Sequence, residues 1–220
     1  TVRVLSGSGF LLGIMAEAPR SAPELVYAHS EQGFALISQR TESIQRMYFQ
    51  CDPEESVDSW SDERIWATLQ ERVAGKDGFR LQEGRIFEKT VLRFRSFVQE
   101  PMRWGNLLLA GDSAHTVPPT GARGLNLAFH DVKVLAEVLL RALGDEGEPA
   151  LADYQPRALE RVWLAQNFSS WMTQLLHTAP GSSPFDHQRQ RGELHNVVSS
   201  RAGRTYLAQQ YTGWPVSSLG

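Results

Sequence analysis

Two kinds of hydrophobic pattern divide this chain, and their order is the feature that most constrains its fold. The first half contains short β-rich runs separated by polar or glycine-bearing turns: ELVYAH, GFALISQR and IQRMYFQ follow an apolar run at residues 10–16. The second half has apolar residues at helical spacing over residues 124–143 and a second long helical segment at 157–177. Strands followed by helices indicate the α+β class, with a mainly antiparallel sheet first and a helical C-terminal part after it.

Shorter elements are expected between and after these patterns. Ser61 suits the N-cap of a helix whose apolar residues share one face. Further strands are expected at residues 86–98 and, as a short apolar strand, at 107–110. Pro156 suits the first turn of the second long helix, and one or two shorter helices are expected to end near Tyr211. In the helix that Ser61 would cap, the apolar face consists of Ile65, Leu69 and Val73.

Composition limits the classes of function. The chain has 220 residues, 41% of them apolar, and a net charge of -3, so it can bury a core but lacks the basic excess that nucleic-acid binding requires. The single cysteine, Cys51, excludes an internal disulfide and fits a reducing compartment. No apolar run is long enough to span a bilayer, and the N-terminus lacks a secretory signal pattern. We therefore expect a soluble, cytoplasmic protein that binds neither nucleic acid nor membrane.

A glycine-rich stretch near the N-terminus is a possible nucleotide site. Residues 4–13 read VLSGSGFLLG, and the three glycines are spaced nearly as in a dinucleotide fingerprint, where glycines let the backbone approach a pyrophosphate at a helix N-terminus. A crossover helix should follow, but Pro19 and Pro23 interrupt the segment. We interpret these residues instead as a flexible entry into a strand.

The most specific segment is LLLAGDSAHTVPPTGARGLNL, residues 107–127. An apolar strand delivers Asp112 to its C-terminal tip, and a helix opens at Gly124 after a Pro-Pro-Thr-Gly turn. Strand tips and helix N-termini are places where open sheets bind ligands, and the free N–H groups of a first helical turn suit an anion or an electron-rich carbonyl. A metal pair formed by Asp112 and His115 is weakly supported, because no other ligand lies nearby in the sequence. We predict no metal site.

The run GDSAHTVPPTGARGLN resembles the second flavin-binding motif of the group A flavoprotein aromatic hydroxylases. The resemblance implies that Asp112 accepts hydrogen bonds from the ribityl hydroxyls of FAD. It also implies that the backbone N–H groups of Leu125 and Asn126 face the pyrimidine end of the isoalloxazine ring, where their dipoles stabilise negative charge. Pro119 and Thr120 would lie where the flavin edge meets the substrate.

Polar side chains recur along three of the expected strands. Ser38 and Arg40 are two residues apart, so they project from one face of a strand, and Arg46 and Tyr48 do the same on the next strand. Tyr27 lies on the strand before. A guanidinium, a hydroxyl and a phenol that converge on one pocket suit a carboxylate attached to an aromatic ring. By itself the pattern is equally compatible with a solvated sheet face.

The segment ELVYAHSEQGFALISQRTESIQRMYFQ resembles the substrate sheet of the 4-hydroxybenzoate hydroxylases within that family, and the resemblance extends over residues 10–215. It implies hydroxylation of a small phenolic acid by O2, with FAD and NADPH as cofactors. By the resemblance, Ser38, Arg40 and Tyr48 bind the substrate carboxylate, and Tyr27 hydrogen-bonds the substrate 4-hydroxyl.

The resemblance also implies a proton relay and two cofactor contacts. Tyr211 would pair with Tyr27 and help to carry the phenolic proton away, which makes the ring carbon ortho to the phenol nucleophilic. Arg46 would lie beside the flavin ring, and Arg95 would contact NADPH. A homodimer is a further expectation from the family.

The family begins with a βαβ unit that bears GxGxxG and holds the ADP part of FAD, and this chain has no convincing copy of it. We therefore expect the chain to start after that unit and to be inactive alone. The predicted domains are a substrate-binding β-sheet domain (1–100), a strand, flavin loop and helix of the FAD domain (101–143), and a helical C-terminal region (144–220). Two alternatives stay open: a non-catalytic module that binds aromatic acids, and a sister hydroxylase for another phenolic acid.

Overall fold

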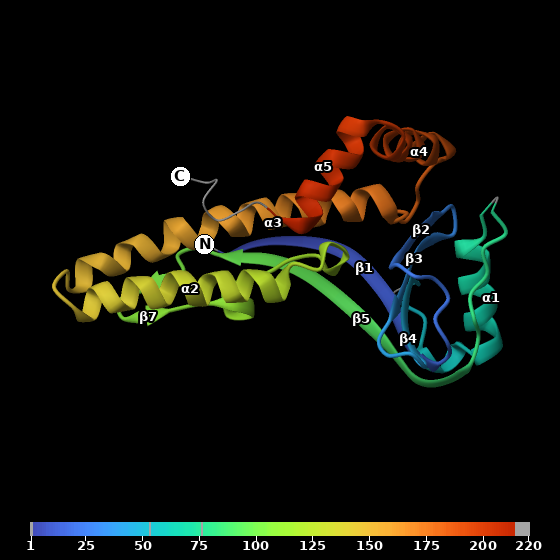
Figure 1. Cartoon of the computed structure of the whole chain (residues 1–220), viewed down its shortest axis with the longest axis horizontal. Helices are drawn as coiled ribbons and strands as arrows, with labels where there is room; N and C mark the ends of the chain where they lie inside the picture. Colours follow the sequence, from blue (N-terminus) through green and yellow to red (C-terminus); the bar gives the residue numbers. More distant parts are fainter. Residues whose placement is uncertain (1, 53, 76, 214–220) are drawn as a thin grey trace. The chain divides into compact units, whose positions relative to one another are not determined.

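The computed structural model describes residues 2–52, 54–75 and 77–213, and it has the α+β architecture expected from the sequence (Figure 1). The chain divides into two compact units. The sheet unit consists of Ser8–Arg93 and Gln174–Asn196. The helical unit consists of Thr1–Gly7, Phe94–Thr173 and Val197–Gly220. The domain boundaries expected from the sequence stay a prediction.

Antiparallel strands form most of the sheet unit. Neighbouring strands follow the order β2-β3-β4-β1-β5, and the β2–β3, β3–β4 and β4–β1 pairs are antiparallel. The first and last of these strands in the sequence are long, and both extend into the residues of the helical unit. The bounds are β1 (Val2–Glu17), β2 (Val26–Ser30), β3 (Gly33–Gln39), β4 (Ile44–Gln50) and β5 (Arg85–Gln99).

Alternation along the strands gives this sheet one buried face. In β4, buried and half-buried residues alternate without interruption, so Met47 and Phe49 belong to the core while Arg46 and Tyr48 lie on the opposite face. In β3, Ala35 and Ile37 are buried in the same way. Ser38, Arg46 and Tyr48 therefore lie on the face that is turned away from the core, whereas the polar side chain of Gln45 is buried on the core face.

Helix α1 (Asp62–Val73) covers the buried face of the sheet, as expected from its apolar spacing. The Ser61 hydroxyl caps the helix by accepting a hydrogen bond from the Arg64 N–H at 3.2 Å. Ile65 and Leu69 are fully buried against the strands. A single 3-10 turn, η1 (Val57–Ser59), precedes the helix.

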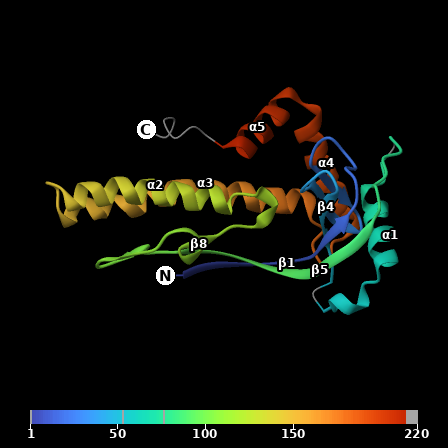
Figure 2. The ribbon, with the colours of Figure 1, turned by 60° about the horizontal axis from the view of Figure 1, so that its bottom comes forward.

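Two long helices dominate the helical unit: α2 (Gly124–Leu143) and α3 (Tyr154–Leu176). They lie side by side in both ribbon views (Figures 1 and 2), and Val134 and Val138 of α2 pack with Tyr154 and Ala158. The 3-10 segment η4 (Glu148–Asp153) joins them. Two shorter helices follow as expected, α4 (Pro184–Ser199) and α5 (Arg201–Thr212).

The segment between β5 and α2 consists of short elements. Strands β6 (Arg103–Trp104) and β7 (Leu107–Leu108) form a hairpin, and β8 (His115–Thr116) pairs with the end of β5. Two 3-10 turns complete the segment: η2 (Gly111–Ser113) and η3 (Pro119–Gly121).

Three expectations about elements need correction or extension. The strand expected at 107–110 ends at Leu108, because Ser113 hydrogen-bonds both backbone groups of Ala110 and turns the chain out of the ladder. The second long helix begins at Tyr154, so Pro156 is its third residue. The first strand is longer than expected.

Residues 4–13 lie within β1, and β2 comes next, so the glycines of VLSGSGFLLG precede no helix. These residues therefore belong to a strand, and the helix that a dinucleotide fingerprint requires does not follow them. Among the described helices, none combines the length and apolarity that crossing a membrane requires.

Candidate functional site

The sheet unit brings four of the predicted site residues onto one face. The register aligns Tyr27 of β2 with Leu36 of β3, Leu36 with Tyr48 of β4, and Tyr48 with Gly13 of β1, so these four form a row across the sheet. Ser38 and Arg46 are paired in the same way, two residues further along their strands. Because side chains two residues apart point to the same side, Tyr27, Ser38, Arg46 and Tyr48 share this face.

Close contacts order the middle of that face. The Arg46 guanidinium lies 4.8 Å from the centroid of the Tyr48 ring, a cation–π contact. The Ser38 hydroxyl donates to the Arg46 carbonyl at 2.8 Å. A side chain at Gly13 would come within 3.2 Å of Tyr48, so the glycine leaves room for the tyrosine ring. The result is a half-buried surface of one cation, one phenol and one hydroxyl.

Arg40 lies just beyond the end of β3, in the turn to β4. Its backbone N–H donates to the Ile44 carbonyl at 2.9 Å, and its side chain is exposed. No ion pair joins this guanidinium to the described part of the chain. It therefore carries a positive charge that a ligand carboxylate could meet.

A cavity of about 590 Å³ lies beside Tyr27 at the edge of the sheet unit. It is formed by residues of β2 together with the end of α1 and the loop that follows it. Ser38, Arg40 and Tyr48 are not among its lining residues, so this cavity and the polar face meet only at Tyr27.

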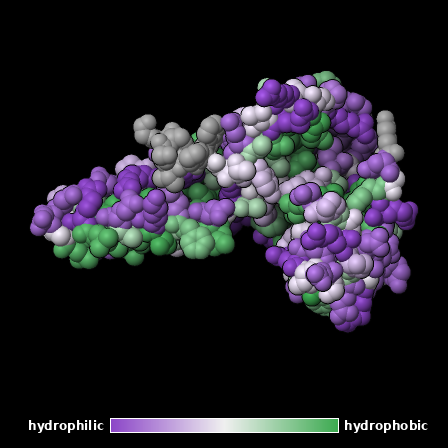
Figure 3. Space-filling model, viewed as in Figure 1, coloured by the Kyte–Doolittle hydropathy of each residue, from purple (hydrophilic) through white to green (hydrophobic). Residues whose placement is uncertain are grey.

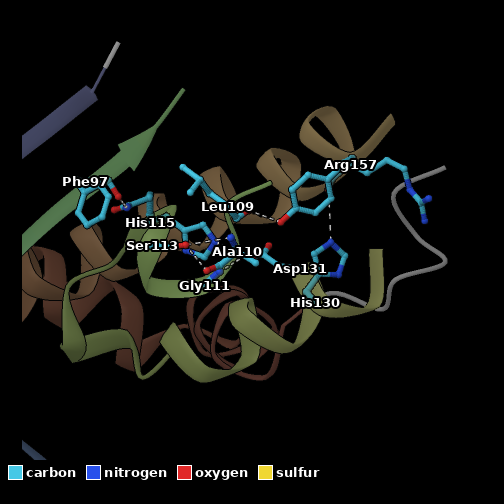
Figure 4. A network of polar contacts seen from close by, with 11 residues as sticks. Phe97, Leu109, Ala110, Gly111, Ser113, His115, His130, Asp131 and Arg157 are labelled. Carbon is cyan, nitrogen blue, oxygen red and sulfur yellow. Dashed lines mark hydrogen bonds and ion pairs between the residues drawn. The ribbon is translucent and has the colours of Figure 1, made fainter. Parts of the chain in front are cut away.

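In the helical unit, the loop Gly111–His115 is held by several hydrogen bonds (Figure 4). Gly111 has φ 60°, the left-handed region that favours glycine, and a Cβ there would lie 3.3 Å from the Ala128 side chain. The Ala114 N–H closes the turn on the Gly111 carbonyl at 2.9 Å. The Gly111 N–H itself donates to Asp131 Oδ2 at 2.8 Å.

Asp112 is exposed at the tip of this loop, together with Ser113. Its side chain makes no hydrogen bond or ion pair within the described residues, so both carboxylate oxygens are available to accept. The carboxylate that contacts His115 belongs to Asp131 of α2, at 2.7 Å from His115 Nε2. The suggested Asp112–His115 pair is therefore not formed.

Helix α2 begins at Gly124 as expected, and Leu125 and Asn126 are exposed in its first turn. Backbone N–H groups in a first helical turn have no partner within the helix. The turn before the helix is tight: a Cβ at Gly121 would lie 2.4 Å from Ser169 Oγ of α3, and Ala122 has φ 52°. A crowded turn of this kind fixes where the first turn of α2 begins.

The other predicted residues of the helical unit differ in exposure. Pro119 is exposed, whereas Thr120 is buried and accepts a hydrogen bond from the Thr173 hydroxyl at 3.2 Å. Arg95 is exposed on β5 and stacks over Phe97. Tyr211 on α5 contacts the Phe168 ring edge-on, at 6.2 Å between centroids. Tyr27 belongs to the sheet unit and Tyr211 to the helical unit, so the relay between them stays a prediction.

A cavity of about 480 Å³ in the helical unit was not expected from the sequence. Burial is the main cause that lowers the pKa of His130, and the charges of Arg161 and Lys133 act in the same direction. The basic residues that line this cavity come from α2, the residue before it and α3, whose pairing the sequence does not specify, so spacing alone gave no signal for the group. They are Arg123, His130, Lys133 and Arg161.

Comparison with known proteins places this geometry in a family. The family model described as "FAD binding domain" matches residues 8–169. The chain is 45% identical over 204 residues to p-hydroxybenzoate hydroxylase of Acinetobacter baylyi, a match that covers 93% of this chain and 50% of that protein. It is 35% identical over 112 residues to tetracenomycin A2 monooxygenase-dioxygenase of Streptomyces glaucescens, covering 49% of this chain and 19% of that protein.

Solved structures agree on the fold. p-Nitrophenol 4-monooxygenase from Pseudomonas putida matches with a TM-score of 0.68 at 20% identity, over 98% of this chain and 56% of that one. Aklavinone-11 hydroxylase, solved with FAD and aklavinone, matches with a TM-score of 0.66 at 18% identity, over 80% of this chain and 34% of that one. The chain spans half of the length of the Acinetobacter relative and 19% of the length of the Streptomyces one.

Proposed function

Since the chain belongs to the family of FAD-binding domains of the group A flavoprotein aromatic hydroxylases, we propose that it forms the substrate- and isoalloxazine-side part of a 4-hydroxybenzoate 3-monooxygenase. The complete enzyme would use FAD, NADPH and O2 to convert 4-hydroxybenzoate into 3,4-dihydroxybenzoate. The observation that carries this proposal is the 45% identity over 204 residues to p-hydroxybenzoate hydroxylase.

The loop and the first turn of α2 fit a flavin. A sugar-like hydroxyl chain needs acceptors, and the Asp112 carboxylate is exposed with no hydrogen bond to the described residues. Hydrogen-bond donors at the pyrimidine end of the ring would stabilise the negative charge of the reduced flavin, and the first-turn N–H groups of Leu125 and Asn126 can supply them. Bound there and reduced by NADPH, the flavin would supply the oxygen-transfer chemistry.

The polar face of the sheet unit fits the substrate. Arg40, Ser38 and Tyr48 would bind the carboxylate, because a guanidinium and two hydroxyls match its oxygens. The Ser38 hydroxyl would exchange its bond to the Arg46 carbonyl for one to the ligand. Fixing the carboxylate end determines which ring carbon faces the flavin. Arg46, stacked on Tyr48, would contribute a positive charge beside the flavin ring.

Activation of the ring would depend on two tyrosines. Tyr27 would take the proton of the substrate 4-hydroxyl, and Tyr211 would pass it on. The resulting substrate phenolate donates charge into the substrate ring, so the carbon ortho to the oxygen becomes nucleophilic. Exclusion of water from the site would protect the oxygen-transferring form of the flavin from decay. Arg95 would meet NADPH, with Pro119 and Thr120 near the flavin edge.

The test is turnover by the complete hydroxylase that contains this chain. With FAD supplied, NADPH oxidation is followed with a panel of benzoates, and the products are identified. The proposal predicts fast oxidation with 4-hydroxybenzoate and 3,4-dihydroxybenzoate as the product. Fast turnover only with another phenolic acid would identify a sister hydroxylase. Benzoate binding without flavin or turnover would identify a binding module.

A further inference from the structure

Asp131 on α2 contacts both ends of the loop that carries Asp112. It is completely buried, and a single oxygen, Oδ2, accepts from the Gly111 N–H at 2.8 Å and lies 2.7 Å from His115 Nε2 (Figure 4). His115 is also buried, with 2% of its surface exposed. Gly111 precedes Asp112 directly, and His115 follows it by three residues. One carboxylate oxygen therefore contacts the loop on both sides of its exposed tip.

We propose that Asp131 is a positioning residue for flavin binding: it fixes the Asp112 loop relative to the first turn of α2. The proposal rests on the proposed function, in which these two segments hold the ribityl chain and the isoalloxazine ring. The backbone donors of Leu125 and Asn126 lie on the same helix as Asp131. The hydrogen bonds that Asp131 accepts from the loop therefore connect the two groups of predicted flavin contacts.

The other hydrogen bonds of the loop do not make this connection. Ser113 bonds to both backbone groups of Ala110, and Ala114 bonds to Gly111, so these contacts are internal to the loop. The Gln99 N–H donates to the Ala114 carbonyl, which ties the loop to β5 and not to α2. Within the described residues, the hydrogen bonds that join this loop to α2 all end on Asp131.

The stability of the fold alone does not explain why the buried residue at position 131 carries a carboxylate. Burying a charged group carries a large desolvation cost, and an apolar residue of similar volume often packs as well or better. The second oxygen, Oδ1, is buried and has no hydrogen-bond partner in the described part of the chain. What the carboxylate supplies is one acceptor placed between two donors, which is a geometric contribution.

Asp131→Asn and Asp131→Leu separate the effect of the hydrogen-bond geometry from the effect of the carboxylate charge. Asparagine has one carbonyl oxygen that can accept from both donors, and its amide group would take the place of Oδ1. Leucine has a similar volume but accepts nothing, so the Gly111 N–H would be buried without a partner. Glu137→Gln serves as the control, because Glu137 is on the same helix but pairs with Arg157 at the surface.

The experiment titrates FAD into the apo form of the complete hydroxylase and records the dissociation constant, the circular dichroism of the bound flavin and the unfolding temperature of the apo form. We expect Asp131→Leu to weaken FAD binding by about tenfold or more, equivalent to about 1.4 kcal/mol, and to alter the flavin spectrum. Asp131→Asn should bind FAD within about threefold of the wild type with an unchanged spectrum, and Glu137→Gln should match the wild type.

Three outcomes would overturn the inference. Wild-type FAD affinity and spectrum in Asp131→Leu would show that the hydrogen bonds do not position the loop. Equal losses of FAD affinity in Asp131→Asn and Asp131→Leu would assign the effect to the charge of the carboxylate. If the leucine variant does not fold, a loss of FAD affinity in the asparagine variant overturns the inference by itself. Failure of the wild-type enzyme to bind FAD would refute the proposed function as well, whereas the first two outcomes leave that function standing.

Discussion

At the scale of single residues, Arg40 is the sharpest test of the carboxylate site. Its guanidinium is exposed and has no ion pair in the described residues, so Arg40→Ala should leave the fold unchanged. Loss of a charge-assisted hydrogen bond to the substrate should raise the dissociation constant of 4-hydroxybenzoate about 10- to 100-fold. Arg20→Ala, another exposed arginine, should have no effect. Unchanged affinity in Arg40→Ala would remove Arg40 from the site.

Loss of the Tyr27 hydroxyl is predicted to affect the coupling of NADPH oxidation to hydroxylation more than the reduction of the flavin. In Tyr27→Phe of the complete enzyme, NADPH should still reduce the flavin, because the hydroxyl is not needed for hydride transfer. Without a group to take the phenolic proton, the ring stays less nucleophilic, so hydrogen peroxide should replace most of the hydroxylated product. The measurement is the ratio of product formed to NADPH consumed. Tyr206→Phe, at an exposed tyrosine of α5, is the control; full coupling in Tyr27→Phe would exclude the role.

His177 predicts a pH dependence of stability in the sheet unit. Its ring stacks on Phe34 at 4.4 Å, and burial lowers the pKa of His177 to about 4. An unfolded histidine binds its proton near pH 6.5, so between about pH 6.5 and 4 the unfolded state holds more protons than the folded one. Stability should therefore fall as the pH is lowered through this window and level off for this group below about pH 4.

The comparison uses urea unfolding of the chain at pH 7, 5.5 and 4.5. His177→Gln should lose less stability over this range than the wild type, because the residue that binds the proton on unfolding is absent. His195→Gln, at an exposed histidine, should keep the wild-type dependence. A His177→Gln variant with the full wild-type loss would contradict the prediction.

At the scale of elements, Arg72 ties α1 to the sheet. The side chain is buried, and Nη1 donates to the carbonyls of Phe34 at 3.0 Å and Gln50 at 2.6 Å. Burial lowers the pKa of Arg72 to about 10, so it stays protonated near neutral pH. Arg72→Leu removes both donors and should lower the free energy of unfolding by about 2–4 kcal/mol.

The matched control is Arg85→Leu, which removes an exposed ion pair with Glu17 and should lower the free energy of unfolding much less, because solvent screens an exposed pair. Urea unfolding followed by tryptophan fluorescence gives both values. If the two variants are equally stable, the buried hydrogen bonds of Arg72 contribute no more than a surface pair.

The elements themselves were largely predictable, because their signals are local. Helix α2 begins and ends at the expected residues, Gly124 and Leu143, and Ser61 caps α1 as expected. The period of two along β4 was enough to predict that Arg46 and Tyr48 share a face, whereas Arg40, paired with Ser38 by the same reasoning, lies beyond the end of β3. The strand at 107–110 was predicted too long, since its end depends on how Ser113 bonds to Ala110.

Contacts across the chain were not predictable in the same way. Asp131 follows Gly111 by 20 residues, and nothing in its neighbourhood of the sequence marks it as the acceptor for the loop. His115 was considered with Asp112 because they are close in sequence, yet its partner comes from another element. The roles of the predicted site residues depend on such tertiary contacts and on ligands, so they stay predictions.

At the scale of the whole molecule, α2 carries apolar side chains that are exposed in the described structure. Its buried side packs on α3, but a second row of apolar residues at helical spacing is exposed along it, visible as the green band over α2 in Figure 3. Soluble proteins rarely leave such a row uncovered. The exposed fractions are Leu125 70%, Phe129 66%, Val132 57%, Leu140 75% and Leu143 84%.

This row predicts how the 220-residue chain behaves when it is prepared by itself. It should self-associate and bind a hydrophobic dye, because burying an apolar row lowers the free energy by about 25 cal/mol for each Å² removed from water. Phe129→Lys combined with Leu140→Lys should weaken both effects without lowering stability, since both side chains are exposed. Phe185→Lys, at an exposed phenylalanine of α4, is the control. A wild-type chain that stays monomeric in equilibrium sedimentation and does not raise the fluorescence of the dye would contradict the prediction.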